Sequence, residues 1–143
     1  MRLGAFSALE VAASGLTAER TRMNTIASNL ANARTTKTAE GGPYKRLDPV
    51  FQATPVNADG IGGPNEPVSM VKVARIQEDQ RDPQMVYEPG HPDADGKGYV
   101  RYPNVNVVEE MVNMITASRA YEAGVSTVES VKSMARSALG IGR

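Results

Sequence analysis

The stretch that decides the fold runs from residue 104 to residue 140 and reads NVNVVEEMVNMITASRAYEAGVSTVESVKSMARSALG. Its large apolar residues recur every three or four positions, which is the period of an amphipathic helix. Asn106 followed by Glu109 is typical of a helix N-cap with an acid at the third helical position. Gly140 stands where a glycine commonly ends a helix. The sequence therefore predicts one helix of roughly 50 Å between these residues.

The other end of the chain predicts a second long helix, of roughly 40 Å, from Ala5 to about Asn32. Ser7 and Glu10 fit a capping box, which would place the first turn near them. The apolar residues of this segment recur at heptad spacing, with Leu9, Leu16, Met23 and Leu30 on one line and Ile26 beside it.

All nine prolines lie between Pro43 and Pro103, so neither predicted helix contains a residue that would break it. In this middle region, β-branched and alternating residues predict strands over 44–56 and 68–77, joined as a hairpin with its tip near 60–64. Pro49 and Pro55 are expected at a sheet edge or a β-bulge, because proline has no N–H to donate to a neighbouring strand. Two shorter strands are predicted over 85–88 and 99–102, with a loop between them.

The predicted fold is α+β, with long N- and C-terminal helices that pair as a coiled-coil-like layer and a small, hairpin-rich middle domain. Its parts are residues 1–42, 43–103 and 104–143. The middle domain holds five of the seven aromatic residues, and we expect its small core to form around them: Tyr44, Phe51, Tyr87, Tyr99 and Tyr102.

Composition excludes several classes of function. The chain has no cysteine, which rules out disulfides and thiolate metal sites. Sixteen basic and sixteen acidic residues balance to zero net charge, which argues against general nucleic-acid binding. No apolar run approaches the ~20 residues of a membrane span. Glu10 interrupts the first apolar stretch, and the apolar core of a signal peptide would not contain such a charge.

Three motifs could indicate a catalytic or ligand-binding site, but a structural role explains each of them more simply. His91 is expected to be an exposed loop residue, because no nucleophile frame accompanies it. Residues 93–98, DADGKG, have a superficial similarity to a calcium loop, but Asn104 occupies the position where glutamate is required. Residues 60–63 are too short for a phosphate loop. We therefore expect no catalytic residue, cofactor or metal.

Two narrow apolar lines do not by themselves enclose a core. The helices either form one seam capped by the middle domain, or they are interaction elements that other subunits complete. A soluble coiled-coil adaptor and a small ligand-binding middle domain remain alternative functions at this point.

Both ends of the chain resemble one protein family. Residues 14–35, SGLTAERTRMNTIASNLANART, resemble the N-terminal signature of bacterial flagellar axial proteins, and residues 104–123 are similar to the matching C-terminal signature. Residues 86–105, VYEPGHPDADGKGYVRYPNV, resemble the proximal-rod members of that family. Gly124 and Asn106 replace the Asn and Asp that relatives tend to have; at Gly124 this predicts a looser helical turn, while the Asn106 cap survives.

The resemblance implies a structural subunit of the basal-body rod, the periplasmic drive shaft that transmits motor torque. It implies export by the flagellar type III apparatus without a cleaved signal peptide, and helical assembly with copies of itself and other rod subunits inside the basal-body rings. No nucleic acid and no membrane span are implied. The expected subunit-interaction residues are Leu9, Leu16, Met23, Asn24, Ile26, Asn29, Leu30, Asn32, Val108, Met111, Ile115, Tyr121, Val125 and Val128.

Overall fold

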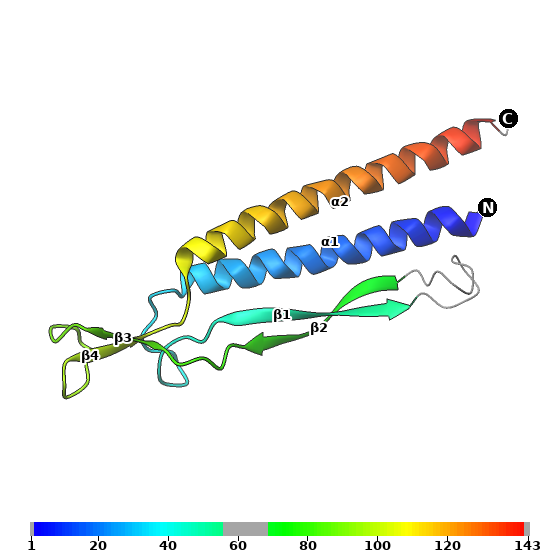
Figure 1. Cartoon of the computed structure of the whole chain (residues 1–143). Helices are drawn as coiled ribbons and strands as arrows, with labels where there is room; N and C mark the ends of the chain where they lie inside the picture. The colour runs from blue at the N-terminus through cyan, green and yellow to red at the C-terminus, as the bar shows by residue number, and fades with distance from the viewer. Residues whose placement is uncertain (1, 56–68, 142–143) are drawn as a thin grey trace.

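The computed structural model describes residues 2–55 and 69–141 of the chain. Within these ranges the chain forms two long helices and two small antiparallel sheets, so the α+β expectation is confirmed (Figure 1). In chain order the elements are α1 (Arg2–Ala31), β1 (Leu47–Pro55), β2 (Ser69–Glu78), β3 (Gln84–Tyr87), β4 (Tyr99–Tyr102) and α2 (Val107–Ile141).

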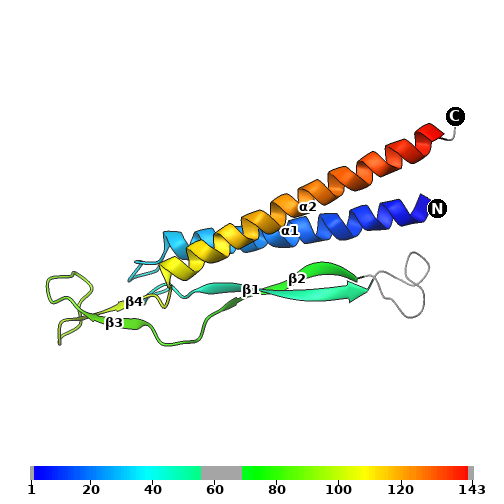
Figure 2. The ribbon, with the colours of Figure 1, turned by 45° about the horizontal axis from the view of Figure 1, so that its top comes forward.

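The molecule is elongated, with α1 in the middle of its long part. α2 runs back beside α1, so both termini lie at one end, and the β1–β2 hairpin lies along α1 (Figure 1). The two helices are closest where α1 ends and α2 begins, and they splay apart toward the termini in both views (Figures 1 and 2). The small β3–β4 sheet projects from the opposite end.

The helix ends confirm one sequence prediction and overturn two. Asn106 caps α2 as predicted, because its Oδ1 accepts the backbone N–H groups of Val108 and Glu109 at 3.1 and 3.3 Å. The predicted start near Ser7 is wrong, since α1 already begins at Arg2. Gly140 does not end α2, which continues to Ile141. A glycine ends a helix when it takes a left-handed conformation, and Gly140 does not take it.

The hairpin forms as predicted, with strand ends shifted by a few residues. β1 pairs with β2 from Leu47 opposite Glu78 to Pro55 opposite Ser69. The register shifts between Val50 and Phe51, just after Pro49, and Pro55 ends β1. Both prolines therefore lie in a strand that has a free edge, where a missing N–H is tolerated. The predicted tip near 60–64 lies outside the described residues.

The loop between β3 and β4 depends on one glycine. Gly98 has φ +84°, a left-handed conformation, and its N–H donates to the Asp95 carbonyl. A Cβ atom at this position would lie 2.8 Å from the ring of Tyr87 and 3.2 Å from Pro89. A residue with a side chain is therefore excluded here by both the backbone and the space.

Gly98→Ala is expected to destabilise the β3–β4 sheet by at least about 1–2 kcal/mol, the cost of a left-handed alanine. Hydrogen exchange at β3 and β4 amides should speed up while exchange in β1–β2 stays unchanged. Gly96→Ala is the matched control, because its φ is not positive and its added Cβ meets nothing within 4 Å. Equal hydrogen-exchange rates in Gly98→Ala and Gly96→Ala would contradict the requirement for a left-handed glycine at position 98.

The predicted aromatic core of the middle region is wrong. Phe51, Tyr87 and Tyr99 are exposed, Tyr87 by 63%. A two-stranded sheet has no second layer to cover its rings, so Tyr87 and Tyr99 pack edge-to-face on each other, with ring centroids 5.3 Å apart. The most deeply buried apolar residues belong to the helices, β4 and the segment that enters α2: Ala18, Ile26, Val100, Pro103, Val105 and Ala117.

Candidate assembly surface and the polar joint beside it

α1 presents two inward faces, one to α2 and one to the hairpin. The predicted line Leu9, Leu16, Met23 and Leu30 is half-buried, and Ile26 beside it is buried. On the other face, the Ser14 hydroxyl accepts the N–H of Val71 at 3.1 Å, and Ala18 and Thr25 are buried. Because α1 packs against both α2 and the hairpin, only one side of this helix faces solvent.

The inward line of α2 passes through Gly124. Residues spaced four and three apart on this line are buried or half-buried: Met114, Ala117, Tyr121, Gly124, Val128 and Val131. A Cβ atom on Gly124 would lie 2.8 Å from Cδ2 of Leu16. The absence of a side chain at Gly124 therefore makes room for Leu16, and packing, rather than a looser turn, explains this glycine.

The outward side of α2 carries a separate apolar line near its start. Val108, Met111, Val112 and Ile115 are all exposed, Met111 by 53% and Ile115 by 57%. Met111 and Ile115 therefore do not pack on α1 within the subunit, whereas Tyr121, Val125 and Val128 are half-buried. Asn24 is exposed, and Asn32 lies at the exit of α1, where its Oδ1 accepts the Thr35 hydroxyl at 3.1 Å.

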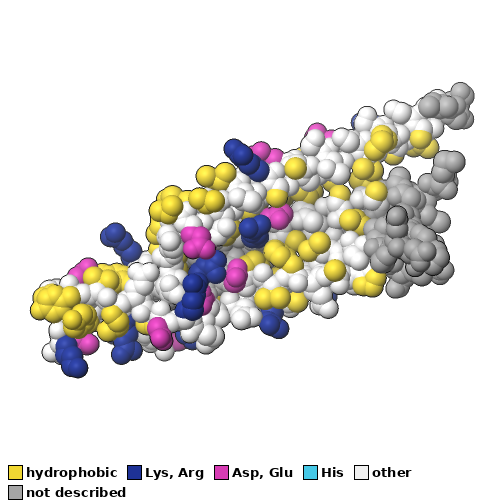
Figure 3. Space-filling model, in the orientation of Figure 1, with side chains coloured by type: hydrophobic (Ala, Val, Ile, Leu, Met, Phe, Trp, Pro, Cys, Tyr) yellow, Lys and Arg dark blue, Asp and Glu magenta, His cyan; other side chains and the backbone are white. Residues whose placement is uncertain are grey.

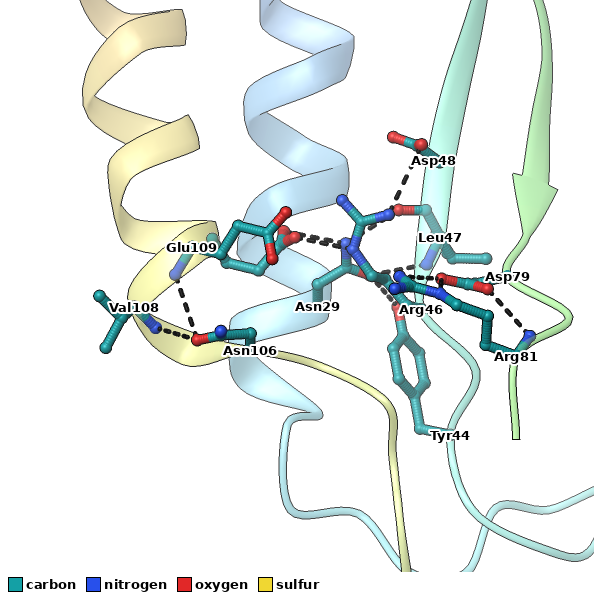
Figure 4. A network of polar contacts seen from close by, with 11 residues as sticks. Asn29, Tyr44, Arg46, Leu47, Asp48, Asp79, Arg81, Asn106, Val108 and Glu109 are labelled. Atoms are coloured by element: carbon teal, nitrogen blue, oxygen red, sulfur yellow. Dashed lines mark hydrogen bonds and ion pairs between the residues drawn. The ribbon is translucent and has the colours of Figure 1, made fainter. Parts of the chain in front are cut away.

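Asn29 is the centre of a buried polar cluster that joins α1, α2 and the start of β1 (Figure 4). Its side chain is fully buried and makes four hydrogen bonds. Nδ2 donates to the Leu47 carbonyl at 2.9 Å and to Glu110 Oε2 at 3.1 Å. Oδ1 accepts the Leu47 N–H at 2.8 Å and the Tyr44 hydroxyl at 3.0 Å. Each hydrogen-bonding position of the amide is thus satisfied.

Glu110 brings α2 into the same cluster. It is 1% exposed, and its Oε1 accepts Arg46 Nε at 2.8 Å in an ion pair. Arg46 also pairs with Asp48, with Nη1 and Oδ2 3.5 Å apart. We name Asn29, Tyr44, Arg46, Leu47 and Glu110 the polar joint, because these residues connect both helices to the stem of the hairpin.

Burial and charge act on the ionisable groups of the polar joint. Burial tends to lower the pKa of Arg46, but the hydrogen bond and charge of Glu110 outweigh it and the pKa is raised. Burial and the Glu110 charge raise the pKa of Tyr44. Next to the joint, side-chain and backbone hydrogen bonds from Arg81 lower the pKa of Asp79 to about 2. Arg46 therefore stays charged and the Tyr44 hydroxyl stays protonated across the physiological pH range.

Sequence reasoning missed Glu110 as a buried residue. A signal was available: Glu110 precedes Met114 and Ala117 at the four-and-three spacing of the inward line. An acid on an apolar line indicates a buried polar partner. Asn29 was expected as a subunit-interaction residue, and within the subunit its side chain is completely buried.

Of the residues considered for a chemical role, His91 and those of 93–98 serve the turn between β3 and β4, whereas residues 60–63 lie outside the described residues. His91 Nδ1 accepts the Asp93 N–H at 3.1 Å, and Asp93 Oδ2 accepts the Thr36 hydroxyl at 2.7 Å. Asp95 Oδ1 accepts the N–H groups of Lys97 and Tyr99. Across residues 2–55 and 69–141, no group of three or more acidic or histidine side chains could hold a metal ion. Neither α1 nor α2, as described, is long and apolar enough to cross a membrane.

Comparison with known proteins points to the same family from both ends of the chain. Residues 9–37 match the family model of the flagella basal body rod protein, and residues 97–141 match the C-terminal model of the flagellar basal body rod FlgEFG proteins. These matches cover all of α1 but its first seven residues, together with β4 and all of α2.

Relatives match over nearly the whole chain. The FlgC basal-body rod protein of Borreliella burgdorferi is 47% identical over 97% of this chain and 98% of its own length. FlgC of Escherichia coli O6:H1 is 46% identical over 94% and 95%, and FlgC of Bacillus subtilis is 40% identical over 97% and 99%. The chain thus belongs to the flagellar basal-body rod family, among the FlgC proteins.

Proposed function

We propose that this structural subunit of the basal-body rod builds the proximal rod by packing its two helices against those of neighbouring subunits. Its place as a rod subunit follows from the family. The observation that carries the finer proposal is the outward apolar line of α2, Val108, Met111, Val112 and Ile115, which lacks cover within the described subunit. Burying apolar surface stabilises an assembly by about 25 cal/mol per Å².

Within the subunit, we propose that α1 and α2 act as a coiled-coil-like layer. The four-and-three spacing of both inward lines and the seating of Leu16 over Gly124 support this pairing. The parts 1–42, 43–103 and 104–143 would then be inner helix, outer domain and inner helix. The polar joint would carry twisting load from the helices into the hairpin, because it connects all three.

The remaining parts of the proposal concern the setting of the assembled rod. The subunit would leave the cell through the flagellar type III export apparatus without loss of a signal peptide. It would take its place in the periplasm, in contact with copies of itself and other rod subunits inside the surrounding basal-body rings. These expectations come from the family resemblance.

In the free subunit we expect the terminal halves of both helices to fray. Met134 and Leu139 are 63% and 67% exposed, and the helices splay apart toward the termini (Figure 1). Amide hydrogen exchange on the purified monomer should be fast there and slowest next to Asn29 and Glu110, where the helices are pinned together. Strong, uniform protection across residues 8–30 in a verified monomer would contradict this expectation.

The proposed function is tested by assembly. In a strain lacking the gene, the tagged chain should restore motility and co-sediment with purified basal bodies. A coiled-coil adaptor would instead remain in soluble complexes, and a small ligand-binding protein would remain a free monomer on size exclusion. Either result, with basal bodies that lack the chain, would refute the rod proposal.

A further inference from the structure

A groove lies on the side of α1 where α2 and the hairpin both flank it. Its floor is formed by residues of α1, including Ala12, Gly15 and Glu19. One wall is α2, with Ala120, Gly124 and Thr127, and the other is the hairpin, with Phe51 and Val71. The groove has a volume of about 510 Å³. Small side chains on floor and wall leave room for side chains of another helix to enter.

One polar atom of this groove is unsatisfied in the subunit. Oε2 of Glu19 is shielded from solvent and has no hydrogen-bond partner within the described part of the chain. Arg22 Nη1 forms an ion pair with this oxygen at 3.7 Å, a distance too long for a hydrogen bond, so the oxygen still lacks a donor within the described part of the chain. A shielded carboxylate oxygen favours an occupant that brings a donor, ideally a cationic one.

The chain itself carries a surface with the complementary chemistry. Val108, Val112, Ile115 and Arg119 are spaced four, three and four residues apart along α2, so they share one helical face. All four are exposed, and Arg119 makes no ion pair among residues 2–55 and 69–141. An apolar stripe that ends in an arginine matches an apolar groove that contains an unsatisfied carboxylate oxygen.

We propose that the groove of one subunit seats this α2 stripe from a second copy, with Arg119 of that copy donating to Glu19. The proposal rests on the rod function proposed above and names one of its interfaces. Groove and stripe are different surfaces of the same molecule, so the contact is heterologous. Repeated without closure, such a contact builds an open helical array rather than a closed dimer.

The face of the molecule drawn in Figure 3 exposes both hydrophobic and charged side chains. Figure 3 shows hydrophobic side chains over both helices and the hairpin, whereas side chains of opposite charge gather near the end where the helices meet.

A charge reversal tests the pairing in cells. Glu19→Lys and Arg119→Glu, each alone, should weaken rod assembly by roughly 10-fold or more, and the double variant should restore it. Glu10→Lys is the matched control, because Glu10 is exposed on α1 and does not line the groove. If both single reversals assemble normally, or if the double variant stays defective, the pairing between copies is refuted.

Cysteine cross-linking tests the geometry directly, because the chain has no native cysteine. Gly15→Cys is well tolerated in space, since an added Cβ meets nothing within 4 Å. A chain that carries Gly15→Cys and Ile115→Cys should give a ladder of cross-linked multimers in oxidised basal bodies. Either single-cysteine variant should give no ladder.

The outcomes separate the two levels of the proposal. If the double-cysteine chain co-sediments with basal bodies but forms no ladder, the rod function stands and the groove assignment is wrong. A single cross-link to a different rod protein would also refute a second copy as the occupant. If the chain does not co-sediment at all, the proposed function itself fails.

Discussion

Glu110→Ala is expected to destabilise the protein by about 3–5 kcal/mol, the cost of removing one partner from a buried ion pair. The substitution removes the buried carboxylate from the largely shielded Arg46 guanidinium, which keeps only the exposed Asp48 at 3.5 Å, and it leaves one amide hydrogen of Asn29 without an acceptor. Unfolding of the purified chain in urea, followed by circular dichroism, measures the change. In cells, the variant should assemble poorly, because the joint between the helices and the hairpin is loosened.

Two controls show that the loss comes from the polar joint. Glu109→Ala removes the neighbouring exposed acid and should cost about 0.3–1 kcal/mol through the helix dipole. Glu110→Leu with Arg46→Met removes both charges and should recover much of the lost stability, because neither charge remains buried alone. Equal losses for Glu109→Ala and Glu110→Ala would show that Glu110 acts merely as a first-turn acid.

Leu16→Asp is expected to abolish rod assembly. Leu16 lies against Gly124 at the contact between α1 and α2, so the substitution places a carboxylate between the two packed helices. Burying such a charge costs several kcal/mol of free energy. Separation of the two helices, which keeps the carboxylate in water, is therefore favoured. Soft-agar motility and electron microscopy of basal bodies measure the effect.

The same variant should leave part of the middle region folded. β3 and β4 pair with each other through Tyr87 and Tyr99, so their signals in a nuclear magnetic resonance spectrum should persist. Thr17→Asp is the matched control, because it places the same charge one residue away on the exposed side of α1 and should leave the helix pair intact in the monomer. Normal motility of Leu16→Asp would refute the packing argument.

Local patterns predicted the elements because each is encoded by neighbours in sequence. The four-and-three spacing predicted both helices, and the Asn106 cap forms with backbone groups two and three residues away. Alternation and turn residues predicted all four strands within a few residues. The errors at Ser7 and Gly140 also concern local signals, since capping preferences are weak beside an uninterrupted helical pattern.

Such local patterns could not predict contacts between residues that are distant in the sequence. Tyr44 was expected in an aromatic core, but its hydroxyl donates to Asn29 in the polar joint. Phe51 and Tyr99 were expected to be buried, but two-stranded sheets do not cover their own faces. Gly124 was read as a local change in the helix, whereas it is a space for Leu16 on another element.

The sequence by itself determined the two helices, the hairpin, the short second sheet and the family, because period, capping and signature residues are properties of neighbouring positions. Tertiary structure alone decided that Asn29 meets Glu110, 81 residues away along the chain, and that Arg46 completes the cluster. It also decided which apolar line of α2 faces α1 and which stays exposed. Helical periodicity defines faces, but only the path of the chain in space assigns each face its neighbour.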